Sequence, residues 1–155
     1  MLALGINFQK GRIRSVLLER NDDDLSLTDR RVIKIDPGLP LPELMERYKS
    51  DFLALIEEFR PNLIAVRNVW ESKGADCATF QIMPAGILAL VSRERAIKLF
   101  AYSPQALRSG GPFGLAKTTK PISAVDETFG VHPPSWDDLQ KGAVLVAWRA
   151  LRETA

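Results

Sequence analysis

Cysteine and histidine are nearly absent from this chain of 155 residues, which contains one of each. The single cysteine, Cys77, excludes an internal disulfide and any zinc site built from several cysteines. The single histidine, His132, has no serine or cysteine motif that would make it the general base of a hydrolase. We therefore expect Cys77 to be a buried apolar side chain and His132 to be an exposed loop residue.

Long apolar runs and targeting signals are also absent. No apolar run reaches the length of a membrane span, so we expect no transmembrane helix and no membrane partner. The first residues, Met1 to Asn7, lack the positive region and the cleavage site of a signal peptide, and their alternation predicts a strand. These absences favour a cytoplasmic location.

Neither sign of charge dominates the chain, because 21 basic and 19 acidic residues give a formal net charge of +2. That balance is not the basic excess that is typical of nucleic-acid-binding domains. Basic residues nevertheless gather in the second half of the chain, at Arg93, Arg95, Lys98, Arg108, Lys117 and Lys120. We interpret them as a solvated face, with a strip that follows a nucleic-acid backbone as the alternative.

The length and the composition favour one domain, residues 1–155, with a sizeable core. Apolar residues make up 46% of the chain and charged residues 26%, which is ordinary for a soluble globular protein. Near its start the chain alternates apolar with smaller or polar residues, which predicts strands over 2–8, 12–20 and 25–35. Short turns separate these strands, so we predict an antiparallel meander.

Beyond Pro40 the apolar spacing switches between helical and strand-like. It predicts helices over 41–59 and 77–95, a strand that ends at 67, a strand over 96–102, a short helix over 103–108, and helices over 116–129 and 138–152. Asp76 is the expected N-cap of the second helix, Ser135 or Asp137 that of the last, and Pro121 can delay the start of the helix at 116. The order predicts a three-layer α/β fold, with a five-stranded mixed sheet of three antiparallel strands and two crossover strands flanked by helices.

A glycine-rich segment, Ser109 to Gly114, precedes the basic residues Lys117 and Lys120. It lacks the lysine and threonine spacing of a phosphate-binding P-loop. We interpret it as a mobile surface loop, with a loop that contacts nucleic acid as the alternative.

The apolar run from Leu63 to Val66 ends abruptly at Arg67 and Asn68. A short uninterrupted apolar run is typical of a strand that is covered on both faces. In open α/β sheets, functional groups lie where strands end. We therefore expect the functional site at position 67, where the residue is an arginine.

Four segments carry a resemblance to a known family: Leu4–Asn7, Pro61–Trp70, Ser72–Asp76 and Trp136–Ala143. In this order of strands and helices they resemble the RNase H-like superfamily and, within it, the RuvC-type Holliday junction resolvases and their uncharacterised relatives. In that family the first strand reads Gly-Ile-Asp, a glutamate follows the fourth strand, and the last helix carries two aspartates three residues apart.

The resemblance implies a nuclease site in which carboxylates hold two divalent metals roughly 4 Å apart. Here the matching positions are Asn7, Arg67, Asp138 and Lys141, and only Asp138 is a carboxylate. Arg67 and Lys141 would place positive charge where the metals belong. We therefore expect an inactivated nuclease centre without metal or catalysis, in which Asp138 and Asp137 are remnants.

Two arrangements of this site stay open. Arg67 and Lys141 can neutralise Asp138 in a salt-bridge network between the strands and the last helix. Alternatively, cations and amides at the strand ends can grip a phosphate. The expected binding residues are Asn7, Arg67, Asn68, Lys141, Lys73 and Trp70.

The sequence thus predicts a non-catalytic binding or scaffold protein, and a homodimer as is common in the family that it resembles. One alternative is a protein that binds branched DNA or RNA. The other is a metal-dependent endonuclease with a rearranged carboxylate site, for which Mg²⁺ or Mn²⁺ would be needed. That rearranged site would use Asp137, Asp138, Glu71 and Asp76.

Overall fold

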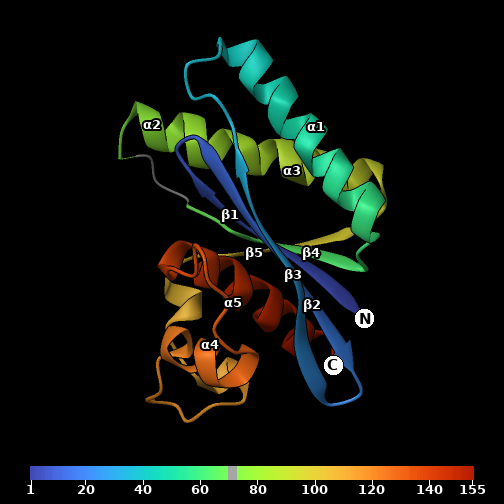
Figure 1. The fold of residues 1–155 in the computed structure, drawn as a ribbon, viewed down its shortest axis with the longest axis vertical. Helices are drawn as coiled ribbons and strands as arrows, with labels where there is room; N and C mark the ends of the chain where they lie inside the picture. Colours follow the sequence, from blue (N-terminus) through green and yellow to red (C-terminus); the bar gives the residue numbers. More distant parts are fainter. Residues whose placement is uncertain (70–72) are drawn as a thin grey trace.

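The computed structural model describes residues 1–69 and 73–155, and Figure 1 shows them as a sheet between two layers of helices. The sheet has five strands in the order β3-β2-β1-β4-β5. The strands are β1 (Leu2–Gln9), β2 (Arg12–Asn21), β3 (Asp24–Lys34), β4 (Leu63–Arg67) and β5 (Lys98–Tyr102). β2 is antiparallel to β1 and to β3, whereas β4 is parallel to β1 and to β5. The predicted three-layer α/β fold with a mixed sheet is confirmed.

Helices cover both faces of the sheet. They are α1 (Leu41–Phe59), α2 (Ala75–Cys77), the π-helical turn η1 (Ala78–Ile82), α3 (Met83–Glu94), the 3₁₀ turns η2 (Gln105–Leu107) and η3 (Gly111–Phe113), α4 (Pro121–Phe129) and α5 (Asp138–Glu153). Two separate apolar clusters form, one between the sheet and α1 with α3, the other between the sheet and α4 with α5 (Figure 1). α1 has the predicted bounds, and α4 begins at Pro121, where a missing N–H costs nothing.

Strand β1 sorts its side chains by size between the two layers. Leu4, Ile6 and Phe8 pack into the cluster with α1 and α3. Ala3 and Gly5 alternate with them and face α5. The small residues on that face let α5 lie directly on the sheet, and ten of its sixteen residues are buried.

Two glycines set the distance between β1 and α5. A Cβ added at Gly5 would overlap the carbonyl oxygen of Ala143. A Cβ added at Gly142 would lie 2.7 Å from the Nδ2 atom of Asn7. Position 5 therefore needs glycine because the backbone of α5 lies directly against it, whereas at Gly142 the space is taken by the side chain of Asn7.

The helical segment that follows β4 differs from the prediction at its start. Gly74 rather than Asp76 is the N-cap of α2, and Asp76 instead forms an ion pair with Lys10 at 3.1 Å. The π-helical turn η1 directly precedes Pro84, which lies in the first turn of α3. Since proline has no N–H to donate, the regular hydrogen-bond ladder cannot run through this point.

The stretch Ala75–Glu94 has the length and the apolar composition of a membrane-crossing helix, which corrects the expectation that no segment reaches that length. Its mean hydropathy is 1.4, and 28% of its apolar window is buried. Met83 and Leu90 on this stretch are exposed. Core helices of soluble proteins meet the same criteria, so this property alone is weak evidence for a membrane span.

In the second half of the chain, one local prediction is wrong and another is incomplete. β5 begins at Lys98 rather than at 96, because Ala96 has a left-handed backbone conformation with φ 55°. The glycine-rich segment lies at the surface as predicted, since Ser109, Gly111, Pro112 and Gly114 are exposed, but one of its side chains anchors it to the core. Phe113 within it is buried, with its ring centre 4.9 Å from that of Trp148.

The rare residues Cys77 and His132 also differ from expectation. Cys77 is partly exposed rather than buried. His132 is half-buried, with its ring edge-on to Trp136 and its Nε2 atom 2.6 Å from the carbonyl oxygen of Phe129. A hydrogen bond to a carbonyl makes Nε2 the donor, so His132 holds the α4–α5 connection in place.

Replacing Gly5 by alanine is expected to lower the free energy of unfolding by about 1–3 kcal/mol, because the methyl group forces α5 away from β1. Urea denaturation measures this change. Gly86→Ala is the matched control, since Gly86 lies within α3 and an added Cβ meets nothing within 4 Å. Alanine there is expected to stabilise the protein by about 0.5–1 kcal/mol. Equal effects of the two substitutions would contradict the close packing of α5 on β1.

The hydroxyl of Tyr48 in α1 is buried without a hydrogen-bond partner among the described residues. Burial raises the pKa of Tyr48 to about 12. The unfolded chain loses this proton near pH ~10, so stability is complete below that pH and falls as the pH rises through the folded-state pKa. Tyr48→Phe is expected to reduce this alkaline loss and to keep stability at pH 7 equal or higher. Urea denaturation at neutral and alkaline pH tests this, and an unchanged alkaline loss in the variant would contradict it.

Candidate functional site

A row of polar side chains crosses the end of the sheet on the face that α5 covers. Arg14 of β2 pairs directly with Asn7 of β1. The pairing of β1 with β4 reaches Ile6 and Val66, so the next position places Arg67 beside Asn7. Asn7 is therefore flanked by an arginine on each side.

Both polar atoms of the Asn7 side-chain amide form hydrogen bonds within the protein. Its Nδ2 atom donates to the carbonyl oxygen of Leu139 in α5 at 2.9 Å, and its Oδ1 atom accepts from the Phe8 N–H at 3.0 Å. A carboxylate at this position could not donate the first of these bonds. Asn7 thus holds β1 against the first turn of α5.

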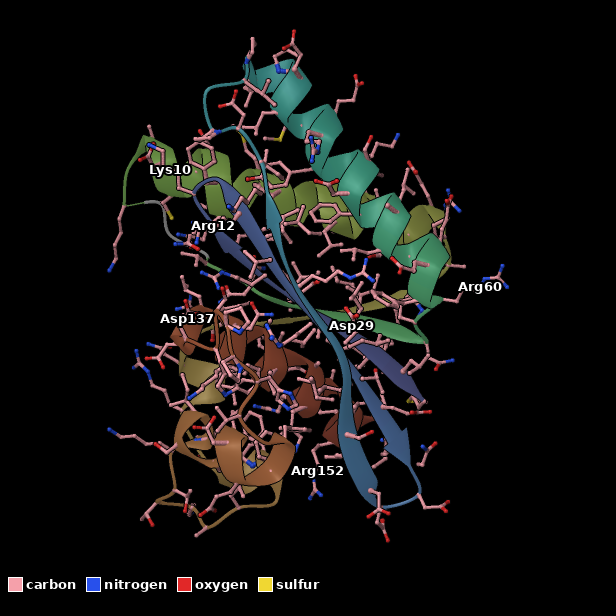
Figure 2. All side chains as sticks on the ribbon, in the orientation of Figure 1. Lys10, Arg12, Asp29, Arg60, Asp137 and Arg152 are labelled. Carbon is pink, nitrogen blue, oxygen red and sulfur yellow. The ribbon has the colours of Figure 1, made fainter. Side chains whose placement is uncertain are left out.

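Arg14 and Asp137 neutralise each other at the start of α5. Arg14 is 2% exposed, and its Nη2 atom lies 3.2 Å from Asp137 Oδ2 and donates to Gln9 Oε1 at 3.0 Å. Asp137 also caps α5 by accepting from the Gln140 N–H at 3.0 Å. Figure 2 shows Asp137 at the same end of the sheet as Lys10 and Arg12.

Lys141 of α5 forms its ion pair with Asp126 of α4. Its Nζ atom lies 3.1 Å from Asp126 Oδ1 in α4, and the same carboxylate accepts from Trp136 Nε1 at 2.7 Å. The hydrogen bond from Trp136 and then the contact with Lys141 lower the pKa of Asp126. The salt-bridge network, which is one of the two arrangements left open by the sequence, therefore does not form among the described residues, because Lys141 pairs with Asp126 of α4 instead of Asp138.

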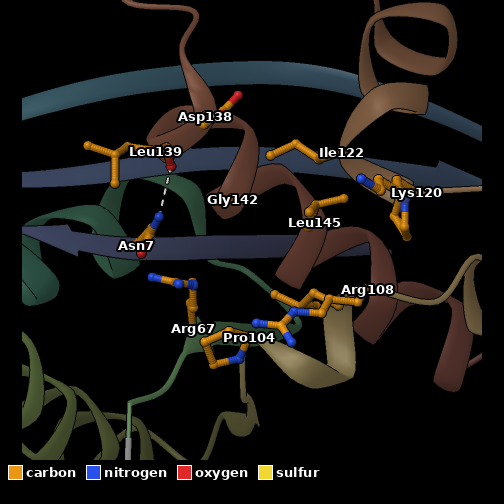
Figure 3. A pocket seen from close by; sticks show the side chains of 12 residues that line it. Asn7, Arg67, Pro104, Arg108, Lys120, Ile122, Asp138, Leu139, Gly142 and Leu145 are labelled. Carbon is orange, nitrogen blue, oxygen red and sulfur yellow. Dashed lines mark hydrogen bonds between the residues drawn. The ribbon is translucent and has the colours of Figure 1, made fainter.

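A pocket of about 480 Å³ opens at this end of the sheet (Figure 3). We call it the basic pocket, because its charged lining consists of Arg67, Arg108, Lys120 and the single acid Asp138. The rest of the lining is Asn7, Pro104, Leu107, Pro121, Ile122, Leu139, Gly142 and Leu145. Its charged groups come from the end of β4, the segment after η2, the residue before α4 and the start of α5.

The positive charge of the basic pocket is not balanced within the described part of the chain. Burial lowers the pKa of the Arg67 guanidinium, and the charge of Arg108 lowers it further. No carboxylate among residues 1–69 and 73–155 forms an ion pair with Arg67, Arg108 or Lys120. Since the remaining acid, Asp138, carries one charge against three, the pocket favours an anion.

The pocket brings together three of the residues predicted from the sequence: Asn7, Arg67 and Asp138. Five others lie outside its lining, namely Asn68, Lys73, Asp76, Asp137 and Lys141. Trp70 and Glu71 lie outside the described residues. Within the described residues no group of three or more histidine, cysteine, aspartate or glutamate side chains could hold a metal ion.

Sequence reasoning missed the roles of Arg14, Arg108 and Lys120. Arg108 and Lys120 belong to the basic residues of the second half of the chain, so a signal for them was present. Two others of that set lie elsewhere, because Arg95 lies 3.6 Å from Glu57 and Lys98 lies over the ring of Phe100. Nothing in the sequence indicated that Arg14 is buried, since an arginine that alternates with apolar residues in a strand normally points to solvent.

Comparisons with known proteins define the class of this fold and then the family that it resembles. No family model matches the sequence. The solved structure of T. thermophilus RuvC in complex with Holliday junction substrate superposes with a TM-score of 0.78 at 18% identity, over 99% of this chain and 94% of the other. The yeast mitochondrial Holliday junction resolvase Ydc2 gives a TM-score of 0.71 at 16% identity, over 98% of this chain and 80% of the other. The fold is therefore the RNase H-like fold of these proteins.

Sequence relatives carry the same name as the first of these structures. The crossover junction endodeoxyribonuclease RuvC of Chloroflexus aggregans is 26% identical over 108 residues, which are 70% of this chain and 66% of the relative, just under two thirds. RuvC of Thermotoga petrophila is 22% identical over 149 residues, which are 96% of this chain and 90% of the relative. The chain thus resembles the RuvC-type Holliday junction resolvases in sequence as well as in fold.

Asn7→Ala is expected to lower the free energy of unfolding by about 1–3 kcal/mol, because it removes the buried hydrogen bond to α5 and leaves the Leu139 carbonyl without its donor. Thermal or urea denaturation measures the loss. Asn21→Ala is the control, since Asn21 is an exposed amide at the end of β2. Similar losses in both variants would contradict the bridging role of Asn7.

Proposed function

We propose that this protein binds nucleic acid through the basic pocket and does not cleave it with metal ions. The observation that carries the proposal is the state of Arg67. This guanidinium is partly buried and lines the pocket together with Arg108, and no carboxylate of the described residues forms an ion pair with it. Removing a cation from water without a counter-ion is costly, so an anion from outside the chain stabilises such a site.

Phosphate is the anion that this set of groups suits best. A guanidinium presents planar pairs of N–H donors that match phosphate oxygens, and a lysine adds a mobile point charge. T. thermophilus RuvC is described in complex with a Holliday junction substrate. The likeness to that protein supports branched DNA as the ligand, while the unbalanced cations supply the contact.

The lack of cleavage follows from the charges that line the pocket. Two-metal hydrolysis of a phosphodiester needs several anionic oxygen ligands. Asp138 is the one carboxylate in the pocket lining, and Arg67 and Arg108 repel a divalent cation there. The proposal therefore assigns no role to Mg²⁺ or Mn²⁺.

The proposal includes a homodimer and a cytoplasmic location. The exposed apolar residues Met83 and Leu90 on α3 lie on the layer opposite the basic pocket, so pairing through that layer would leave the pocket open. The alternative is a scaffold protein that binds no nucleic acid.

The double variant Arg108→Ala, Lys120→Ala is expected to weaken binding to a fluorescent four-way DNA junction by roughly tenfold or more and to reduce the salt slope of log K by about two, because two phosphate contacts are lost. Fluorescence anisotropy between low and physiological salt measures both. Arg93→Ala, which removes an exposed cation of α3 outside the pocket, is the matched control and is expected to bind as the wild type does.

Two results would contradict the proposal. The first is a junction affinity that is equally low for the wild type and the double variant, which would favour the scaffold alternative. The second is cleavage of branched or linear DNA by the wild type in Mg²⁺ or Mn²⁺. Calorimetric titration with each metal alone provides an independent measurement, for which no binding is expected.

A further inference from the structure

The basic pocket is more apolar than the binding of a phosphate requires. Six of its lining residues are apolar side chains or prolines: Pro104, Leu107, Pro121, Ile122, Leu139 and Leu145. A phosphate of a continuous duplex would be satisfied by the cations alone, and its hydrated backbone would gain nothing from an apolar wall. The apolar part of the pocket therefore matches a second, uncharged part of the ligand.

Building on the nucleic-acid binding proposed above, we propose that the basic pocket holds one unstacked nucleoside monophosphate unit. Arg67 and Arg108 bind its phosphate, and Lys120 at the opposite edge of the pocket adds positive charge. The base lies against the apolar wall that α4 and α5 form. This chemistry has two sources, a free nucleotide and an unpaired nucleotide within a DNA strand.

The arrangement of side chains separates the two ends of such a ligand. Figure 3 shows Arg67 and Arg108 together with Pro104 on one side of the pocket, and Ile122, Leu139 and Leu145 on the other, where Lys120 lies at the edge. Because both guanidinium groups lie on the same side of the pocket, we place the phosphate of the ligand between them. The apolar side chains opposite them come from the first turns of α4 and the N-terminal half of α5.

The size of the pocket agrees with this ligand. Its volume of about 480 Å³ lies within the range of small-molecule and cofactor sites. A base that is stacked and paired within a duplex cannot enter such a pocket, whereas an extruded or unpaired base can. The pocket therefore distinguishes unpaired nucleotides from paired ones by shape.

Asp138 determines which way round the ligand lies in the pocket. It is the one carboxylate of the lining, and it lies at the start of α5 together with Leu139 rather than with the cations (Figure 3). A carboxylate repels phosphate and accepts hydrogen bonds from hydroxyl and amino groups. Asp138 thus directs the phosphate to the cations and can accept a bond from the sugar or from an exocyclic amine of the base.

Isothermal titration calorimetry with inorganic phosphate, adenosine and AMP tests the ligand class on the whole protein. AMP is expected to bind at least about tenfold more tightly than inorganic phosphate or adenosine, because it alone uses both sides of the pocket. Arg108→Ala is expected to weaken AMP and phosphate alike. Ile122→Trp is expected to weaken AMP while leaving phosphate binding unchanged, because the indole fills the apolar side. Arg93→Ala is expected to change neither.

Anisotropy with two DNA duplexes distinguishes the sources of the nucleotide. Both duplexes carry a one-nucleotide bulge, but in one of them the bulged nucleotide is abasic, so the phosphates are identical and the base is missing. Tighter binding of the bulge that has a base assigns the pocket to an unpaired nucleotide of DNA. Equal binding of both duplexes together with tight AMP binding assigns it to a free nucleotide, and each result supports the nucleotide pocket.

Equal affinities for AMP and inorganic phosphate, together with equal affinities for the two bulged duplexes, would overturn the nucleotide pocket. This comparison needs only the wild-type protein, so it stands even when a variant fails to fold. The proposed nucleic-acid binding would survive that result as long as the junction is still bound and the double variant still weakens it. If the wild-type protein does not bind the junction, the proposed function is contradicted, whatever the result for the nucleotide pocket.

Discussion

The contact between α5 and β1 is the constraint on which the rest of the structure depends. Gly5 and Gly142 lack the side chains that would hold helix and strand apart, and Asn7 donates a hydrogen bond across the contact to Leu139. α5 can then lie flat on the sheet, buried among residues of β1, β2 and β4. Its first turn reaches the strand ends and forms one wall of the basic pocket. The pocket has this shape because the helix comes so close to the sheet.

The same contact decides what charges the pocket presents. The hydrogen bond to Leu139 needs a donor at position 7, which an amide provides and an ionised carboxylate does not. Ion pairs remove further charges, since Asp137 is bound to Arg14 and Lys141 to Asp126. What is left facing the pocket is three cations and Asp138. The resemblance implies carboxylates at these positions that bind divalent metal ions. In this chain the charges at the same positions favour an anion instead.

Much of the fold could be predicted because it follows from local patterns. The alternation in β1 and the helical spacing of α1 gave their bounds closely, and Pro121 marked the start of α4. The departures lie where one backbone conformation or one contact overrides the pattern. Ala96 turns the chain before β5, and the packing of Phe113 on Trp148 orders a glycine-rich segment that looks like a loop. Neither effect can be seen in composition or periodicity.

The sequence by itself determined the order of strands and helices and the arginine at the end of β4, since each depends on neighbours in the chain. It also places Asn7 and Arg67 where the resemblance implies carboxylates. Only the tertiary structure decided which charges are paired. From the sequence, Lys141 and Arg67 are both cations at positions where the resemblance implies carboxylates. In the structure Lys141 forms an ion pair with Asp126, whereas Arg67 lines the basic pocket together with Arg108. The physical reason is that an ion pair depends on distances of about 4 Å between side chains from different elements, which sequence spacing does not encode.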